Sequence, residues 1–309
     1  MSFGAVNAKP FLFASLGGVL FAGIWSGAFI ATKIGLDDMQ PLWLAQTRLA
    51  MAGLIFFLLT RAETIRFWKT ATPGRWITVL VSGILSQAVY LGATYWALTL
   101  LSAGAVAIVV AALPLIAVPM GALLLRERIA VVDVGAALVG GIGVVIVALG
   151  RDAAPLNDTN LAALPVLMTF IAVLALAAGN ALIKPCVNLR TIGPICATQM
   201  IVSSVVLLPV ALYFHGQFSM TFSAQGMGAF CYLVLAGSVL GTYVWLKVLK
   251  FFTSKSASLF FLLTPVFSLF IGYFLLNEPL TPQKLVGAAL ISGSILVNAC
   301  WYLRRGRAG

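Results

Sequence analysis

Apolar residues fill most of this chain in long runs, and short polar stretches separate the runs. A helix that crosses about 30 Å of hydrocarbon needs roughly 20 apolar residues. Ten runs approach that length, at residues 11–32, 41–60, 76–99, 103–125, 131–149, 161–183, 194–214, 226–248, 256–276 and 284–303. Lipid cannot satisfy unpaired backbone donors, and the runs are too long and uniformly apolar for barrel strands. The pattern therefore predicts an all-α membrane protein with ten transmembrane helices.

Composition agrees with this pattern and excludes a water-facing surface over most of the chain. Hydrophobic residues make up 61% and charged residues 9%, with a mean hydropathy of +1.07. Nineteen Lys and Arg against eight Asp and Glu give a net charge of +11. Fifteen of the basic residues fall on one side of the predicted topology and three on the other, which predicts cytoplasmic termini in a bacterial-type inner membrane. Since the excess charge is explained by topology, no nucleic-acid partner is expected.

An internal repeat runs through the chain. Four residue pairs share an offset of 151 positions: Pro114 with Pro265, Glu127 with Glu278, Lys33 with Lys184 and Thr47 with Thr198. We predict one repeat over residues 1–150, a polar linker at 151–160, and a second repeat over 161–309. Each repeat has five predicted spans, an odd number, so the second should enter the membrane from the opposite side. Inverted repeats around a central midplane site are typical of secondary transporters.

The repeated proline-to-glutamate element has two interpretations. Pro114 and Pro265 should kink their helices, while Glu127 and Glu278 anchor the helix ends at the interface or pair with neighbouring arginines. The same element could serve as a gate that flexes when the site changes its exposure. The two interpretations are compatible.

Arg48 is the basic residue deepest in a predicted span, where a charge costs about 2.5–3.5 kcal/mol on insertion scales. Its repeat counterpart, Gln199, is neutral. A structural or gating contact, direct substrate contact and snorkelling towards the outer face all remain open for this side chain.

Other intramembrane polar and aromatic residues are candidates for a binding cavity. Gln87, Tyr90 and Thr94 share one helix face at i, i+3 and i+7, with Tyr95 turned partly away. This stripe is suited either to helix packing or to a cavity for a polar or aromatic molecule. Trp25, Asn180, Thr242 and Trp245 also lie well inside their spans.

Acidic residues are missing from the middle of every predicted span, so a buried carboxylate relay is not expected and facilitated diffusion or exchange is favoured. The four cysteines lack metal-ligand spacing, and we expect neither a metal nor a cofactor. A membrane-embedded lipid-modifying enzyme is the main alternative from another class. Its acids would include Asp37 and Asp38, the only acidic pair. A non-transporting receptor or assembly subunit is a second alternative, and the oligomeric state is open.

Four segments together resemble the drug/metabolite transporter superfamily, specifically its EamA-type exporters: WSGAFIATK, QTRLAMAG, PLIAVPMGALLLRER and TPVFSLFIGYFLLNEPLTPQKLVGAAL. The first copy departs from the family pattern by RER in place of GER. The resemblance implies two five-helix bundles around a cavity faced by Trp25, Gln87, Tyr90, Asn180, Thr242 and Trp245. It also implies a transporter rather than an enzyme, exporting amino acids or similar small metabolites. Nucleotide-sugar and sugar-phosphate carriers share this fold and are the alternative within it.

Overall fold

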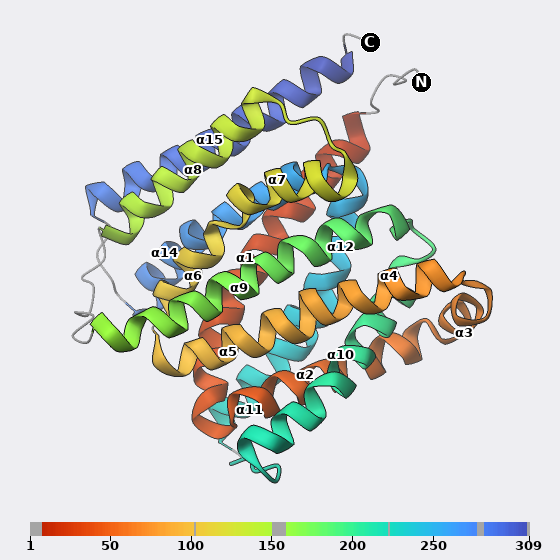
Figure 1. The fold of residues 1–309 in the computed structure, drawn as a ribbon. Coiled ribbons are helices and arrows are strands. Elements are labelled where there is room, and N and C mark those ends of the chain that lie inside the picture. The colour runs from red at the N-terminus through yellow and green to blue at the C-terminus, as the bar shows by residue number, and fades with distance from the viewer. Residues whose placement is uncertain (1–7, 102, 150–158, 222, 277–280, 308–309) are drawn as a thin grey trace.

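The computed structural model describes residues 8–101, 103–149, 159–221, 223–276 and 281–307, which form helices joined by short turns (Figure 1). Within these ranges the one extended pairing is an isolated bridge between Met39 and Met220. The fold is therefore all-α, as the apolar pattern predicts.

In the first half of the chain, the described residues form eight α-helices and one π-helical segment. In order these are α1 (Ala8–Asp38), α2 (Pro41–Leu59), α3 (Arg61–Thr70), α4 (Pro73–Gly83), the π-helix η1 (Ile84–Val89), α5 (Tyr90–Leu100), α6 (Ala103–Ala111), α7 (Leu113–Leu125) and α8 (Val131–Leu149). The segments α4, η1 and α5 follow one another without a break and form one long helix.

The second half follows the same plan. Its elements are α9 (Thr159–Ile183), the 3₁₀ turn η2 (Lys184–Cys186), α10 (Ile192–His215), α11 (Ala224–Tyr232), the π-helix η3 (Leu233–Leu240), α12 (Gly241–Phe251), α13 (Ser254–Ser258), the 3₁₀ turn η4 (Leu259–Leu262), α14 (Leu263–Leu276) and α15 (Pro282–Arg307). A π-helical segment again interrupts one long helix, here between α11 and α12.

Among the described residues, six helical segments are long and apolar enough to cross a membrane: Leu12–Asp38, Pro41–Leu59, Pro73–Leu100, Leu164–Cys186, Ile192–His215 and Ala224–Phe251. Four shorter apolar helices occur at Val109–Leu125, Val131–Ile146, Ser254–Phe267 and Leu285–Asn298. Large apolar side chains are exposed on the outside of the bundle, including Leu123 at 76% and Val131 at 90%. Such a surface suits lipid rather than water, and the protein is a multi-pass membrane protein.

One helix was not expected from the sequence. The charged stretch between the second and third apolar runs forms α3, which buries Thr64 and Phe67. It has too few apolar residues to span a bilayer, so a search for long apolar runs passes over it.

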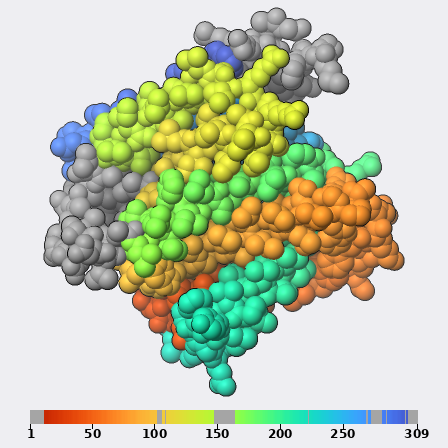
Figure 2. All heavy atoms as spheres, viewed as in Figure 1, coloured from red at the N-terminus to blue at the C-terminus, as the bar shows by residue number. Residues whose placement is uncertain are grey.

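The helices pack in pairs that join the two halves of the chain. In Figure 1, α8 and α15 run side by side, and α2 packs against α10. The central helix α1 contacts α12 and α14, and its counterpart α9 contacts α5 and α7. On the face shown in Figure 2, α9, the α4–α5 helix and α10 cover the surface as adjacent bands. Each half thus completes the core of the other.

Glycines permit the closest of these approaches. A Cβ added at Gly53 in α2 would lie 2.9 Å from the Ile201 side chain and 3.0 Å from the Ile201 backbone nitrogen in α10. At Gly143 in α8 it would lie 2.8 Å from the carbonyl oxygen of Gly287 in α15. Both helix pairs therefore meet backbone to backbone.

The expected kinks near the repeated prolines take the form of breaks just before them. Ala112 separates α6 from α7, and Pro114 lies in the first turn of α7. Pro265 lies in the first turn of α14, directly after the 3₁₀ turn η4. Proline lacks a backbone N–H and is well tolerated at a helix start, which explains why the irregularity precedes it.

Candidate functional site

A pocket lies between α1, α2 and α5. Its cavity volume is about 20 Å³, which is room for about one water molecule, and it is partly open to the outside. Its polar and aromatic lining consists of Trp25, Phe29 and Thr32 from α1, Arg48 from α2, and Tyr90, Thr94 and Tyr95 from α5; Ala28 and Leu91 complete it. Three residues that the sequence singled out as cavity candidates, Trp25, Tyr90 and Thr94, are thus brought together beside Arg48.

Arg48 is held in place by neutral groups. Its side chain is 3% exposed. Nε donates a hydrogen bond of 2.7 Å to Oγ of Ser238 in η3, and Nη1 donates to the Tyr95 hydroxyl. The guanidinium carbon also lies 5.9 Å from the centroid of the Tyr95 ring, a cation–π arrangement. Within the described part of the chain, no carboxylate forms an ion pair with this arginine.

Two polar atoms in the pocket wall lack hydrogen-bond partners. They are Nε1 of Trp25 and Oγ1 of Thr94, and both are buried. Both groups lie near the Tyr90 hydroxyl without reaching hydrogen-bond geometry. The rings of Trp25 and Tyr90 are stacked, with centroids 5.8 Å apart and an interplanar angle of 23°. Because buried polar groups are nearly always paired in native proteins, these two atoms mark a place where a ligand or water can bind.

Asn180 and Trp245 pair with each other instead of lining this pocket. Nε1 of Trp245 donates to Oδ1 of Asn180 over 3.0 Å, and both side chains are buried. The Trp245 ring packs against Phe21 and Phe261, with centroids 4.8 and 4.9 Å away. Phe21 in turn packs against Trp25. The pair thus supports the pocket wall from behind.

Gln87 and Thr242, the remaining cavity candidates, lie elsewhere. Gln87 is half-buried in η1 and Thr242 is buried in α12, and neither contributes to the lining of the pocket. The pocket faces the side of α5 defined by Tyr90, Leu91, Thr94 and Tyr95.

Tyr95 is the pocket residue that helical spacing placed wrongly. We expected it to turn partly away from the stripe, but it contacts Arg48 and lines the pocket. The α5 residues that line the pocket are spaced i, i+1, i+4 and i+5. This face is rotated about the helix axis relative to the predicted i, i+3, i+7 stripe. A buried arginine on a neighbouring helix was the available signal, because a phenolic hydroxyl can accept its hydrogen bonds.

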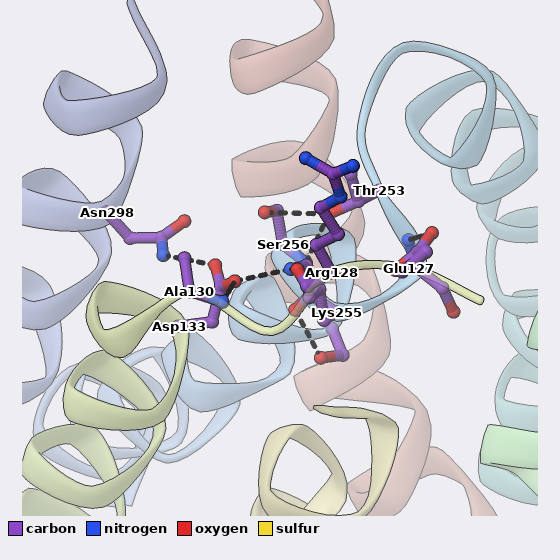
Figure 3. A network of polar contacts seen from close by, with 10 residues as sticks. Glu127, Arg128, Ala130, Asp133, Thr253, Lys255, Ser256 and Asn298 are labelled. Carbon is purple, nitrogen blue, oxygen red and sulfur yellow. Dashed lines mark hydrogen bonds and ion pairs between the residues drawn. The ribbon is translucent and has the colours of Figure 1, made fainter. Parts of the chain in front are cut away.

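A second polar cluster joins α8, α13 and α15 (Figure 3). Nζ of Lys255 lies 2.5 Å from Oδ2 of Asp133, and the two side chains are 3% and 2% exposed. Asn298 donates to Oδ1 of Asp133 over 3.1 Å, the Ala130 backbone N–H donates to Oδ2, and Lys255 also donates to the carbonyl oxygen of Arg128. The sequence placed Asp133 and Lys255 at helix ends or in loops. Both do lie in the first turns of their helices, α8 and α13, and there the packing of α13 against α7 buries them as an ion pair.

Glu127 caps a helix of the other repeat. Its Oε1 accepts a hydrogen bond of 3.1 Å from the backbone N–H of Ser254, the first residue of α13, while Oε2 is buried without a hydrogen-bond partner. A carboxylate at a helix start complements the helix dipole. Glu127 thus anchors a helix start of the second repeat, whereas the sequence suggested the end of its own helix. Its repeat counterpart, Glu278, lies outside the described residues.

The repeated lysines make equivalent contacts. Lys33 donates to the carbonyl oxygen of Leu98 at the end of α5, over 2.7 Å. Lys184 donates to the carbonyl oxygen of Leu249 at the end of α12, over 3.0 Å, and also to that of Phe252. Each lysine satisfies carbonyl groups left free at a helix C-terminus. Since Leu98 and Leu249 are themselves 151 residues apart, the repeat extends from sequence to side-chain contacts.

A multi-pass helical bundle with an internal repeat and a polar, aromatic pocket in its interior has the architecture of a membrane transporter. Comparison with known proteins agrees. The sequence pattern described as "EamA-like transporter family" matches residues 12–149 and again residues 163–300. The chain belongs to this family of the drug/metabolite transporter superfamily.

Similar proteins include Protein PecM of Dickeya dadantii, which is 26% identical over 89% of this chain and 88% of its own length. A probable amino-acid metabolite efflux pump of Salmonella typhimurium is 26% identical, with 91% and 92% of the two chains covered. A solved crystal structure at 20% identity superposes with a TM-score of 0.73 and covers 94% of this chain and 98% of that one. The last likeness concerns the fold.

Proposed function

We propose that this transporter exports small metabolites, amino acids or similar compounds, across the inner membrane by alternating access. The observation that carries the proposal is the part-open pocket in which Trp25, Arg48, Tyr90 and Thr94 converge. A concave site with an aromatic wall and a few convergent polar groups is what a small polar molecule requires. The similarity to a probable amino-acid metabolite efflux pump supports the choice of substrate.

The proposed transport unit consists of two inverted five-helix repeats, residues 1–150 and 161–309, with ten spans and both termini in the cytoplasm. Two features support this arrangement. Contacts of α1 with α12 and α14 are matched by contacts of α9 with α5 and α7. The Lys33 and Lys184 caps are matched in the same way. Helices that correspond to each other in the two repeats can rock about a shared site.

The cluster around Glu127 and the Lys255–Asp133 pair would form the cytoplasmic gate in this topology. It ties the turn between α7 and α8 of the first repeat to α13 and α15 of the second. The pocket residues would then lie in the outer halves of α1, α2 and α5, on the other side of the bundle. Breaks before Pro114 and Pro265 would let α7 and α14 move when the gate opens.

The wider substrate path would be lined in other conformations by Gln87, Asn180, Thr242 and Trp245. In such a state the Trp245–Asn180 hydrogen bond would be free to open towards the substrate. Coupling to an ion gradient is not part of the proposal, because no Asp or Glu lies in the middle of a predicted span. Transport would run down the substrate gradient or by exchange.

Flux into liposomes tests the proposal directly. Purified protein should give saturable uptake of a labelled amino acid or related metabolite without any ion gradient. Trp25→Ala should lower that flux at least tenfold, because it removes one aromatic wall of the pocket. Tyr213→Ala is the matched control, since Tyr213 is 83% exposed on the outer face of α10.

Folded protein that moves no metabolite from a broad panel would contradict the proposal. So would a Trp25→Ala variant that transports as well as the unmodified chain. Melting temperatures of both variants in detergent separate a loss of function from a loss of folding.

A further inference from the structure

We infer that the pocket is an anion site in which Arg48 binds a carboxylate, so that the preferred substrate carries a net negative charge. The inference rests on the proposed function for the movement of that substrate, but the binding site itself stands on separate observations. They concern the partners of Arg48, its counterpart in the second repeat, and the unpaired polar atoms beside it.

Arg48 keeps its charge where solvent barely reaches it. Its hydrogen-bond partners among the described residues, Ser238 and Tyr95, offer neutral hydroxyl groups, and its side chain is 3% exposed. Neutral hydroxyls stabilise a guanidinium through single hydrogen bonds, whereas a carboxylate can take two parallel bonds and cancel the charge. The pocket beside Arg48 is where such a carboxylate would bind, and its volume of about 20 Å³ means that lining side chains must move to admit one.

The second repeat shows that packing alone does not require this charge. Gln199, 151 positions after Arg48, is 2% exposed and donates a hydrogen bond of 2.8 Å to Oγ of Ser82. Arg48 reaches Ser238 inside the π-helix η3, and Gln199 reaches Ser82 two residues before the π-helix η1. In both repeats a side chain of the second helix thus binds a serine beside a π-helical segment of the other repeat. An amide does this in one copy, so the positive charge in the other copy serves another purpose.

The unpaired atoms of the pocket complete a carboxylate site. Thr94 is 1% exposed and its hydroxyl has no hydrogen-bond partner, and the Trp25 indole N–H is likewise unpaired. Both groups can donate to an anion. The stacked rings of Trp25 and Tyr90 offer a surface for an apolar or planar body attached to that carboxylate.

The lining also discriminates against a positive group on the substrate. None of the described residues that line the pocket is Asp or Glu. An ammonium group would therefore find no carboxylate partner near Arg48 and would be repelled by it. A monoanionic organic acid should accordingly bind better than a zwitterion of the same size, so among the small metabolites of the proposed function the inference favours organic acids over amino acids.

Three ligands of nearly the same shape test the inference on the purified full-length protein in detergent: benzoate, benzamide and benzylamine. A ligand that binds the folded state stabilises it by RT ln(1 + [L]/Kd), so the rise in melting temperature at a given concentration reports the affinity. We expect benzoate to raise the melting temperature, and the neutral and cationic compounds to need at least tenfold higher concentrations for the same shift. Arg48→Gln should weaken benzoate binding at least tenfold, because it removes a charge-assisted pair.

Two further variants serve as controls for folding and for the specific role of Arg48. Arg48→Lys retains the charge without the planar fork, and should keep part of the benzoate effect if Arg48→Gln fails to fold. Gln199→Met removes the equivalent buried hydrogen bond in the other repeat and should leave benzoate binding unchanged. Equal stabilisation by benzoate and benzamide, or undiminished benzoate binding in Arg48→Gln, would overturn the inference.

Flux measurements distinguish this inference from the proposed function. Benzoate binding that depends on Arg48, with no flux of any carboxylate, would leave the anion site standing and remove the transport proposal. Saturable amino-acid flux that neither benzoate nor Arg48→Gln affects would support the transport proposal and overturn the anion site.

Discussion

Lys255 and Asp133 carry opposite charges in a position from which solvent is excluded, 2.5 Å apart. A buried ion pair of this kind contributes little net stability compared with apolar residues. Removal of one partner, however, leaves an uncompensated charge and costs about 3–5 kcal/mol. The two members should therefore respond very differently to single and double substitution.

We expect Lys255→Met to lower the melting temperature of the purified protein strongly, because Asp133 is then buried without its cation. The double variant Lys255→Met with Asp133→Leu should recover most of the loss. Lys69→Met, at an exposed position of α3, is the control and should change little. A double variant as unstable as the single one would show that Lys255 acts through its other contacts.

At the level of single residues, the sequence predicted part of the candidate site. Trp25, Tyr90 and Thr94 could be found from polar or aromatic character inside an apolar run, and they meet in one pocket. The Lys255–Asp133 and Trp245–Asn180 pairs could not be found, because each joins helices far apart in the chain. Spacing along one helix shows which residues share a face, but not what that face meets.

Some helix pairs pack closely at glycine positions, where the added methyl group of an alanine would not fit. At Gly53 the obstacle includes the backbone nitrogen of Ile201, which cannot move aside without shifting α10. Overpacking of this kind costs about 1–3 kcal/mol. The α2–α10 pair joins the two repeats, so the effect should extend to the whole bundle.

Gly53→Ala should accordingly destabilise the protein in thermal melts. Gly135→Ala in α8 is the matched control, since a Cβ at Gly135 meets nothing within 4 Å. Alanine is favoured over glycine inside a helix by about 0.5–1 kcal/mol, so the control should be neutral or slightly stabilising. Equal behaviour of the two variants would mean that α2 and α10 can separate without cost.

Helix positions were predictable because a long apolar run has few alternatives in lipid. The helical segments of the structure cover all ten predicted runs. The π-helices η1 and η3 were not predictable, since one extra residue per turn leaves no mark on composition. The short helix α3 was missed because it is charged and has too few apolar residues to span a bilayer, so a search for long apolar runs passes over it.

In the whole molecule, helices of one half pack against helices of the other. The proposed orientation in the membrane can be tested independently of transport. In a variant without its four cysteines, a single cysteine at Gln217 should react with a membrane-impermeant maleimide added outside intact cells. A cysteine at Leu189 should react only after the membrane is opened. Both positions are exposed in turns that flank α10. Reversed labelling would place the termini outside.

Arg48 gives the molecule an electrical property that follows from its buried position. A unit charge that crosses the full membrane field changes in energy by about 2.3 kcal/mol per 100 mV. If the empty carrier switches its site from one side of the membrane to the other, the charge of Arg48 moves through part of that field. The membrane voltage then favours one direction of this conformational change. A bound carboxylate cancels the charge, so the loaded step is indifferent to voltage. The cell's resting potential would then set how quickly the unloaded carrier resets.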